Sequence, residues 1–325
     1  MATYHVILSV YVLTFLIGMP ANLLAFYAFV RKVLDKPTPT DVLLLNLTVS
    51  DLLFLFFLPL KMYEASNNME WNLPRFLCSI TTFVFFSTIY TSSLLLMAVS
   101  VDRYLCVAHP LQYKVRRKPL HGVIGCVIIW VTSTLHLCFI YIVEQPEKTS
   151  SAPLSSEVKH CYDNFTQEQL NVVLPMRLEL CIVLYFIPLV VCTFCYFRFI
   201  FILNRASSLH PGKKKRAVGM AVGTLLVFVV CFMPYNITHV QGFITWNNVP
   251  WRSEALLLTT INTILDPVTF YFSSTAFQSN LKNLLSFKSK SGSTGNLMNP
   301  NQINRDIEGQ ANHPAVTISS DITPL

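Results

Sequence analysis

Long apolar stretches separated by short polar segments dominate this chain. Seven can be followed along it, at residues 6–30, 42–63, 76–101, 122–143, 174–203, 217–245 and 253–272. Each is near the ~20 residues that an α-helix needs to cross a hydrocarbon core of about 30 Å. No stretch shows the alternation over about ten residues that is typical of a transmembrane β-strand. The pattern therefore predicts an all-α integral membrane protein, a bundle of seven transmembrane helices.

The pattern changes after residue 272. Phe277, Leu281, Leu284 and Leu285 recur at helical spacing, which predicts a short amphipathic eighth helix on the inner membrane surface. Residues from about 288 to 325 are polar, with few aromatic side chains, so we predict a disordered tail. These boundaries divide the chain into a seven-helix domain with its amphipathic helix, residues 1–286, and a cytoplasmic tail, residues 287–325.

Composition and charge agree with a membrane protein. Of 325 residues, 53% are hydrophobic and 13% are charged, and the mean hydropathy is +0.49, too apolar for an ordinary soluble domain. The net charge of +7 does not point to nucleic acid, because the basic residues gather in alternate loops, at 31–36, 114–118 and 205–216. By the positive-inside rule those loops are cytoplasmic. We therefore expect a multi-pass plasma-membrane protein with its N-terminus outside and its C-terminus inside the cell.

Two of the nine cysteines fall on the outer side of the predicted bundle. Cys78 begins the third span and Cys161 precedes the fifth, whereas the other seven lie within or beside apolar spans. Because the outside is an oxidising compartment, we predict a disulfide between Cys78 and Cys161. The sequence Asn164-Phe165-Thr166 in the same loop is a candidate acceptor for glycosylation at Asn164.

Acidic residues lie inside two spans. Asp51 is in the second and Asp266 in the seventh, and intramembrane carboxylates are functional by default because burying them is costly. The alternative is a hydrogen-bonded polar cluster that holds helices together. Pro234 and Pro267 also interrupt spans, and each removes a backbone hydrogen bond, which favours a kink.

Three candidate cations lie in the outer parts of their spans. They are Arg177, His239 and Arg252. A guanidinium at the edge of lipid is costly unless it meets an anion, and its planar fork suits a carboxylate. For Arg177 the alternatives are a pair with a loop acid such as Glu168, or an extended side chain that reaches the interface. His136, in the fourth span, is a further candidate, although a lone histidine is more often a packing residue.

Motifs in several spans resemble those of rhodopsin-like G-protein-coupled receptors. Asp102-Arg103-Tyr104 at the inner end of the third span is similar to the family's Asp-Arg-Tyr junction, and Asp266-Pro267 to its Asn-Pro-x-x-Tyr box in altered form. The resemblance implies that Asp102, Arg103 and Tyr104 couple to heterotrimeric G proteins. It also implies an activation switch, formed by Asp51, Phe232, Pro234, Asp266 and Pro267, with a sodium ion at Asp51 as the one candidate metal. Phe232 replaces the usual Trp, and Phe270 the usual Tyr.

Local sequences in several spans resemble the free fatty acid receptors, particularly the short-chain members. The likeness is carried by residues 173–180, 231–239, 250–252 and 271–274. It implies that Arg177, His239 and Arg252 hold a carboxylate. Phe86, Tyr235 and, from its depth in the fourth span, His136 are further ligand-binding candidates. Acetate, propionate and butyrate are the implied ligands, and inhibitory (Gi/o) and phospholipase-linked (Gq) G proteins are the implied partners.

Other interpretations remain open at this point. The same cations would suit a nucleotide, a hydroxy acid, a leukotriene or a longer fatty acid. A carboxylate transporter is a further alternative, although no internal inverted repeat is seen. We expect neither an enzyme nor a cofactor other than the sodium ion. Serine and threonine in the tail make receptor kinases and arrestin candidate partners, beside the lipid bilayer.

Overall fold

The computed structural model describes residues 2–138, 161–162, 165–205 and 211–273. The predicted eighth helix, the tail, Asn164 and most of the loop before the fifth span lie outside these residues. The helices, in chain order, are α1 (Ala2–Asp35), α2 (Pro39–Ser66), α3 (Arg75–Ala108), α4 (Pro110–Arg116), α5 (Pro119–Leu137), α7 (Gln167–Cys181), the π-helix η1 (Ile182–Phe186), α8 (Ile187–Arg205), α9 (Pro211–Val227), the π-helix η2 (Phe228–Phe232), α10 (Met233–Thr245) and α11 (Arg252–Ser273).

The predicted spans correspond to these helices. Six continuous helical stretches in the described part are long and apolar enough to cross a membrane, with α7, η1 and α8 forming one and α9, η2 and α10 another. The seventh helix, α11, has 22 residues, or roughly 33 Å of helix. Large apolar side chains are exposed around the bundle, among them Phe56, Leu135 and Phe197. Lipid is the solvent that makes such a surface favourable.

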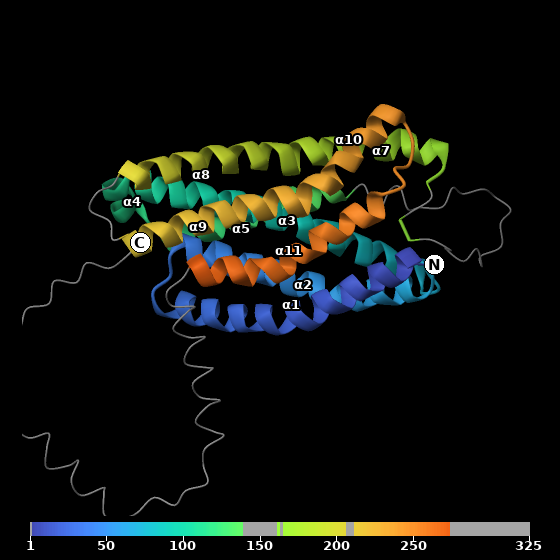
Figure 1. The fold of residues 1–325 in the computed structure, drawn as a ribbon, viewed down its shortest axis with the longest axis horizontal. Helices are drawn as coiled ribbons and strands as arrows, with labels where there is room; N and C mark the ends of the chain where they lie inside the picture. The colour runs from blue at the N-terminus through green and yellow to red at the C-terminus, as the bar shows by residue number, and fades with distance from the viewer. Residues whose placement is uncertain (1, 139–160, 163–164, 206–210, 274–325) are drawn as a thin grey trace, which may run out of the picture. The chain divides into compact units, whose positions relative to one another are not determined.

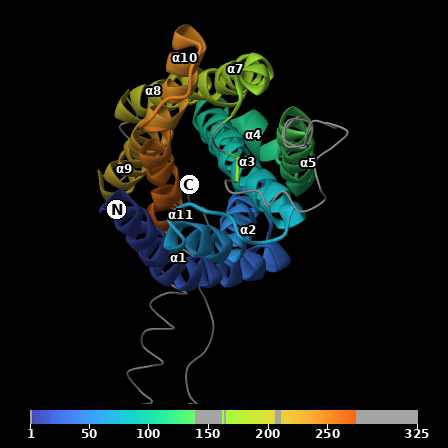
Figure 2. The same ribbon diagram turned by 90° about the vertical axis from the view of Figure 1, so that its right-hand side faces the viewer.

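Helix α3 is the most deeply buried of these spans. It packs against α2, α5, α8 and η1, while α1 packs against α2 and α11. The long helices run side by side along the bundle (Figure 1), and the view along it shows α5 on the outer side of α3 (Figure 2). Buried Phe85, Phe86, Tyr90 and Leu95 of α3 belong to the main apolar core. Because α3 runs the length of the bundle, it contributes residues at both of its ends.

Proline shapes the fifth and sixth spans. The π-helix η1 ends two residues before Pro188, and η2 ends two residues before Pro234. Proline lacks an N–H group, and its ring collides with the carbonyl group one turn earlier, so a wider π-turn accommodates it. Figure 1 shows the resulting change of direction between α9 and α10. The sequence predicted a disturbance at Pro234 but not its π-helical form.

The disulfide between Cys78 and Cys161 is present, with the two Cα atoms 5.6 Å apart. It fastens the segment before the fifth span to the N-terminal end of α3. Trp71 packs beside it and is almost fully buried. The bond thereby positions Tyr162, the next residue along the chain, over the outer end of the bundle.

Candidate functional site

A pocket of about 200 Å³ lies between α3, α5, α7 and α10, near the end of the bundle that the charge pattern predicts to be outer. It is lined by Phe86, Tyr90, Leu137, Tyr162, Arg177, Leu180, Tyr235 and His239. Four of the predicted ligand-binding residues therefore meet here: Arg177, His239, Tyr235 and Phe86. A guanidinium and an imidazole therefore lie among aromatic rings and leucine side chains in one small pocket.

Among the described residues that line this pocket, Arg177 is the one arginine, and there is no lysine. Its side chain is only 4% exposed. Its guanidinium lies over the rings of Phe165 and Tyr162, at 5.0 and 5.3 Å from their centroids. Its Nε and Nη2 atoms have no hydrogen-bond partner within the described residues. These two atoms form the edge of the guanidinium that binds a carboxylate through two parallel hydrogen bonds. A pair with Glu168 is not seen, and the side chain does not extend to the surface.

His239 lies on α10 beside this arginine and is also buried. Its Nε2 atom is 3.3 Å from the hydroxyl oxygen of Tyr90, and its Nδ1 atom has no partner in the described part of the chain. When the Tyr90 hydroxyl donates to Nε2, the proton of the neutral imidazole is on Nδ1. The ring of Tyr235, one turn earlier on α10, packs edge-on against the imidazole at 4.5 Å. His239 can therefore offer one N–H donor to a ligand.

Arg252 lines a second, neighbouring pocket. This pocket has a volume of about 530 Å³ between α1, α2, α3 and α11. The Nη2 atom of Arg252 donates to the carbonyl oxygen of Tyr162 at 3.2 Å, and its side chain is hydrogen-bonded to Tyr235. Both pockets share Phe86 and Tyr162. The three predicted cations thus gather around Tyr162 and Tyr235, with Arg252 on the far side of Tyr162.

The structure does not bring His136 into the outer pocket. Its Nδ1 atom donates to the carbonyl oxygen of Thr132 at 2.8 Å, and its Nε2 atom is 3.1 Å from Oε1 of Glu179. Successive helical residues point about 100° apart, so Leu137, the next residue, lines the pocket while His136 turns toward α7. His136 therefore links α5 to α7 and is not among the described residues that line the outer pocket.

Sequence reasoning missed four lining residues: Tyr90, Leu137, Tyr162 and Leu180. Tyr90 could have been found, because it follows Phe86 by one helical turn and so shares its face. Tyr162 could have been noted as the neighbour of Cys161, which the predicted disulfide fixes at the bundle. Its backbone has a φ of 59°, a left-handed conformation uncommon outside glycine. Leu137 and Leu180 carry no signal that separates them from ordinary core leucines.

A polar pocket of about 220 Å³ lies deeper in the bundle, lined in part by Asp51, Phe232 and Asn262. Asn262 donates to Asp266 at 2.8 Å, and the carboxyl groups of Asp51 and Asp266 are hydrogen-bonded. Four buried oxygens have no partner in the described residues: Asn22 Oδ1, Asp51 Oδ2, Asn262 Oδ1 and Asp266 Oδ1. Unpartnered carboxylate and amide oxygens are suitable ligands for a hard cation. The residues present therefore fit the sodium ion predicted at Asp51.

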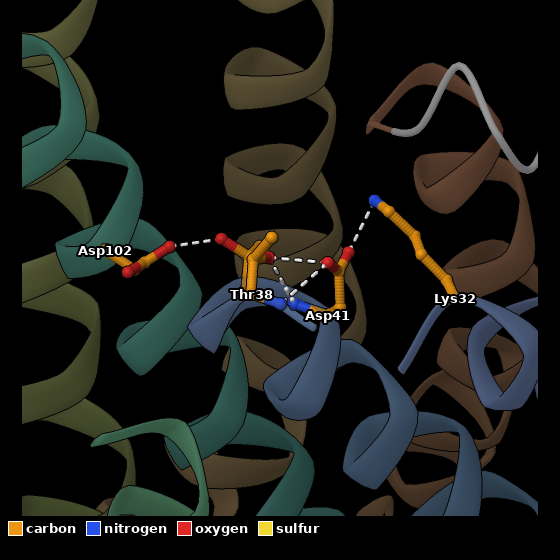
Figure 3. Close-up of polar contacts among 5 residues, drawn as sticks. Lys32, Thr38, Asp41 and Asp102 are labelled. Atoms are coloured by element: carbon orange, nitrogen blue, oxygen red, sulfur yellow. Dashed lines mark hydrogen bonds and ion pairs between the residues drawn. The ribbon is translucent and has the colours of Figure 1, made fainter. Parts of the chain in front are cut away.

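At the opposite end of the bundle, Asp102 joins three elements. Its carboxylate accepts hydrogen bonds from the Thr40 hydroxyl on α2 and, at 2.9 Å, from the Tyr113 hydroxyl on α4. Burial and the nearby Asp102 carboxylate raise the pKa of Tyr113, so its hydroxyl keeps its proton. Asp41, on the same turn as Thr40, pairs with Lys32 of α1 (Figure 3). The predicted coupling residues Asp102, Arg103 and Tyr104 thus lie near the C-terminal end of α3.

Comparison with known proteins agrees with this arrangement. Residues 21–270 match the model of the 7 transmembrane receptor (rhodopsin family). The chain is 44% identical over 286 residues to human free fatty acid receptor 3, covering 86% of this chain and 80% of the relative. It is 46% identical over 269 residues to mouse free fatty acid receptor 2, covering 82% and 81%.

More distant receptors also match. The chain is 30% identical over 298 residues to proteinase-activated receptor 1 of Xenopus laevis, covering 89% of this chain and 70% of the relative. These proteins are receptors and not enzymes, as the sequence led us to expect. Seven helices, an outer pocket with a buried arginine and these similarities lead to one conclusion. The chain belongs to the rhodopsin family of G-protein-coupled receptors and, within it, to the free fatty acid receptors.

Proposed function

We propose that this chain is a plasma-membrane receptor for short-chain carboxylates such as acetate, propionate and butyrate. The observation that carries the proposal is the buried guanidinium of Arg177, a residue that lines this pocket of about 200 Å³ and whose Nε and Nη2 atoms have no hydrogen-bond partner among the described residues. A buried guanidinium is costly unless it meets an anion, and no such partner lies among the described residues, so an anionic ligand would stabilise this site. The names of the relatives, free fatty acid receptors 2 and 3, support the same ligand class.

The carboxylate would accept two parallel hydrogen bonds from Nε and Nη2 of Arg177 and a third from Nδ1 of His239. Arg252 contributes a second positive charge from across Tyr162, and it also orients Tyr162 and Tyr235 through its hydrogen bonds. The short aliphatic chain would then lie against Leu137, Leu180 and Phe86. Each buried methylene contributes only ~0.8 kcal/mol, so the head group supplies most of the binding energy and affinity is weak.

Ligand binding would reach the inner end through the sixth span. Tyr235 and His239 lie on α10, which continues through η2 into α9, and Phe232 of η2 lines the deeper polar pocket. A shift of α10 would therefore alter the surroundings of Asp51 and Asp266. A sodium ion held by Asp51 there would favour one arrangement of the helices and so act as an allosteric ligand. With the N-terminus outside and the C-terminus inside, Arg103 would meet Gi/o- or Gq-type G proteins at the cytoplasmic face.

The deciding experiment is G-protein activation in cells that express the chain, measured against straight-chain carboxylates from two to sixteen carbons. We expect responses to the short acids and none to their methyl esters or alcohols, which lack the charge that Arg177 needs. A response to nucleotides, hydroxy acids or leukotrienes in place of short acids would contradict the ligand class. Saturable, concentrative uptake of radiolabelled acetate would instead favour a transporter.

A further inference from the structure

Two aromatic rings separate the outer pocket from the larger pocket next to it. Phe86 and Tyr162 are the residues that line both, and their ring centroids are 5.3 Å apart. Both side chains are buried, at 6% and 7% exposed. Phe86 also stacks on Tyr235 at 6.0 Å, and Tyr162 packs edge-on against Phe165 at 5.0 Å. The two rings therefore form a packed wall, fixed by neighbours on both sides.

We propose that this wall of Phe86 and Tyr162 sets the longest acid the receptor accepts, by closing the carboxylate pocket off from the space beyond it. The inference rests on the proposed function and adds a specificity determinant to it. On the near side, the pocket of about 200 Å³ is bounded by leucines and aromatic rings, which leave little room for added carbons. On the far side lies the pocket of about 530 Å³, which shares only Phe86 and Tyr162 with the near pocket among their described lining residues.

The far pocket is suited to an acyl chain. Ile7, Phe85 and Leu256 give it apolar walls. Three charged residues also line it: Nζ of Lys61 pairs with Oε2 of Glu64 at 2.8 Å, and Arg252 donates to the carbonyl oxygen of Tyr162. An acid anchored at Arg177 could therefore extend its tail into this space if the wall were opened. Phe86 is the side chain to remove, since Tyr162 also anchors Arg252 through its carbonyl group and follows the disulfide.

The experiment compares dose–response curves of G-protein activation for acids from two to twelve carbons in the wild type, Phe86→Ala and Phe85→Ala. Phe85 is the matched control: it is the same residue type on the same helix, it is buried, and it lines the far pocket without bordering the carboxylate pocket. Surface expression is matched by labelling an extracellular epitope. Methyl esters of the longer acids report any effect that does not require the carboxylate.

We expect Phe86→Ala to respond to acids beyond the wild-type limit, with potency rising about fourfold per added carbon, the fold-change that corresponds to ~0.8 kcal/mol per buried methylene. Phe85→Ala should keep the wild-type limit. Phe86→Leu, which leaves an aliphatic side chain in the wall, should extend the limit by less, and it serves as the test if the alanine variant does not reach the surface.

Two results would contradict the proposal that the wall of Phe86 and Tyr162 sets the chain-length limit. One is an unchanged chain-length limit in surface-expressed Phe86→Ala or, failing that variant, in Phe86→Leu. The other is an equal extension in Phe85→Ala, which would assign the limit to general loosening of α3. A wild type that is silent toward every acid would instead overturn the proposed function itself, so the two failures can be told apart.

Discussion

At the scale of single residues, the binding proposal depends on the shape of Arg177 as much as on its charge. Its Nε and Nη2 atoms form a fork with both donors available, and the rings of Tyr162 and Phe165 hold the guanidinium plane. A lysine would keep the charge but replace the fork by a single strongly hydrated ammonium group. Charge alone is therefore not sufficient at this position.

We predict that Arg177→Lys lowers the potency of propionate substantially. Losing one charge-assisted hydrogen bond costs about 1.5–3 kcal/mol, which is roughly a 10- to 150-fold change in potency. The control is Arg205→Lys, the same change at the exposed inner end of the same transmembrane span. Potency measured at equal surface expression checks the prediction, and an Arg177→Lys curve that overlays the wild type would refute it.

The two histidines of the outer half should behave differently. His239 lines the pocket and has an available Nδ1 atom, whereas His136 is occupied by Thr132 and Glu179. We predict that His239→Ala weakens the response to propionate roughly tenfold or more, the equivalent of a lost hydrogen bond to a charged group. His136→Ala should stay within about threefold of the wild type, since a partly exposed contact between an imidazole and a carboxylate is worth little. A reversed order of the two effects would contradict the site described above.

At the scale of elements, close approach of two helices depends on a glycine. A Cβ atom on Gly122 of α5 would lie 2.8 Å from the carbonyl oxygen of Pro39 on α2, which is backbone and cannot move aside easily. On the same helix, a Cβ atom on Gly125 would meet nothing within 4 Å. Small residues let membrane helices pack closely, where no hydrophobic force between them is available.

We therefore predict that Gly122→Ala and Gly125→Ala have opposite effects on stability. Overpacking at Gly122 should cost about 1–3 kcal/mol and lower the melting temperature of the purified receptor. Alanine at Gly125 should be neutral or stabilising, because alanine favours a helix over glycine by up to ~1 kcal/mol. Thermal unfolding in detergent measures both, and equal melting temperatures for the two variants would show that α5 and α2 tolerate separation.

At the scale of the whole molecule, the disulfide connects the ligand pocket to α3 across 83 residues of chain. We predict that Cys78→Ser, Cys161→Ser and the double variant lose stability alike, by about 2–5 kcal/mol, because each removes the same bond. All three should also weaken the ligand response, since Tyr162 follows Cys161 directly. Additive losses in the double variant would show that the two cysteines act separately.

The inner end of the molecule should be separable from the outer pocket. Arg103 lies at the opposite end of α3 from Phe86, about 17 residues or roughly 25 Å along the helix. We predict that Arg103→Ala leaves surface expression and acid binding largely intact while abolishing G-protein activation. Binding is measured by competition with a radiolabelled acid and activation by nucleotide exchange. Full activation by this variant would remove Arg103 from the coupling role.

The sequence by itself determined the helical bundle. In lipid, the backbone of each spanning segment must form its hydrogen bonds within that segment, so apolar runs of the right length predict helices. It also identified Arg177, His239 and Arg252 as unusual, since a cation in an apolar span is costly wherever it points. These inferences require only the chemistry of a residue and its position along a span, both of which can be read from the sequence.

Only the tertiary structure decided which side chains meet. It turned His136 toward Glu179 and Leu137 into the pocket, although the two are adjacent in sequence, because helix packing fixes the rotation of α5. It placed Arg252 beyond Tyr162 and brought Tyr90 to His239. It also divided the outer end into two pockets at Phe86 and Tyr162. Such contacts join residues far apart in the chain, and the rotation and tilt of each helix, which no local pattern encodes, determine them.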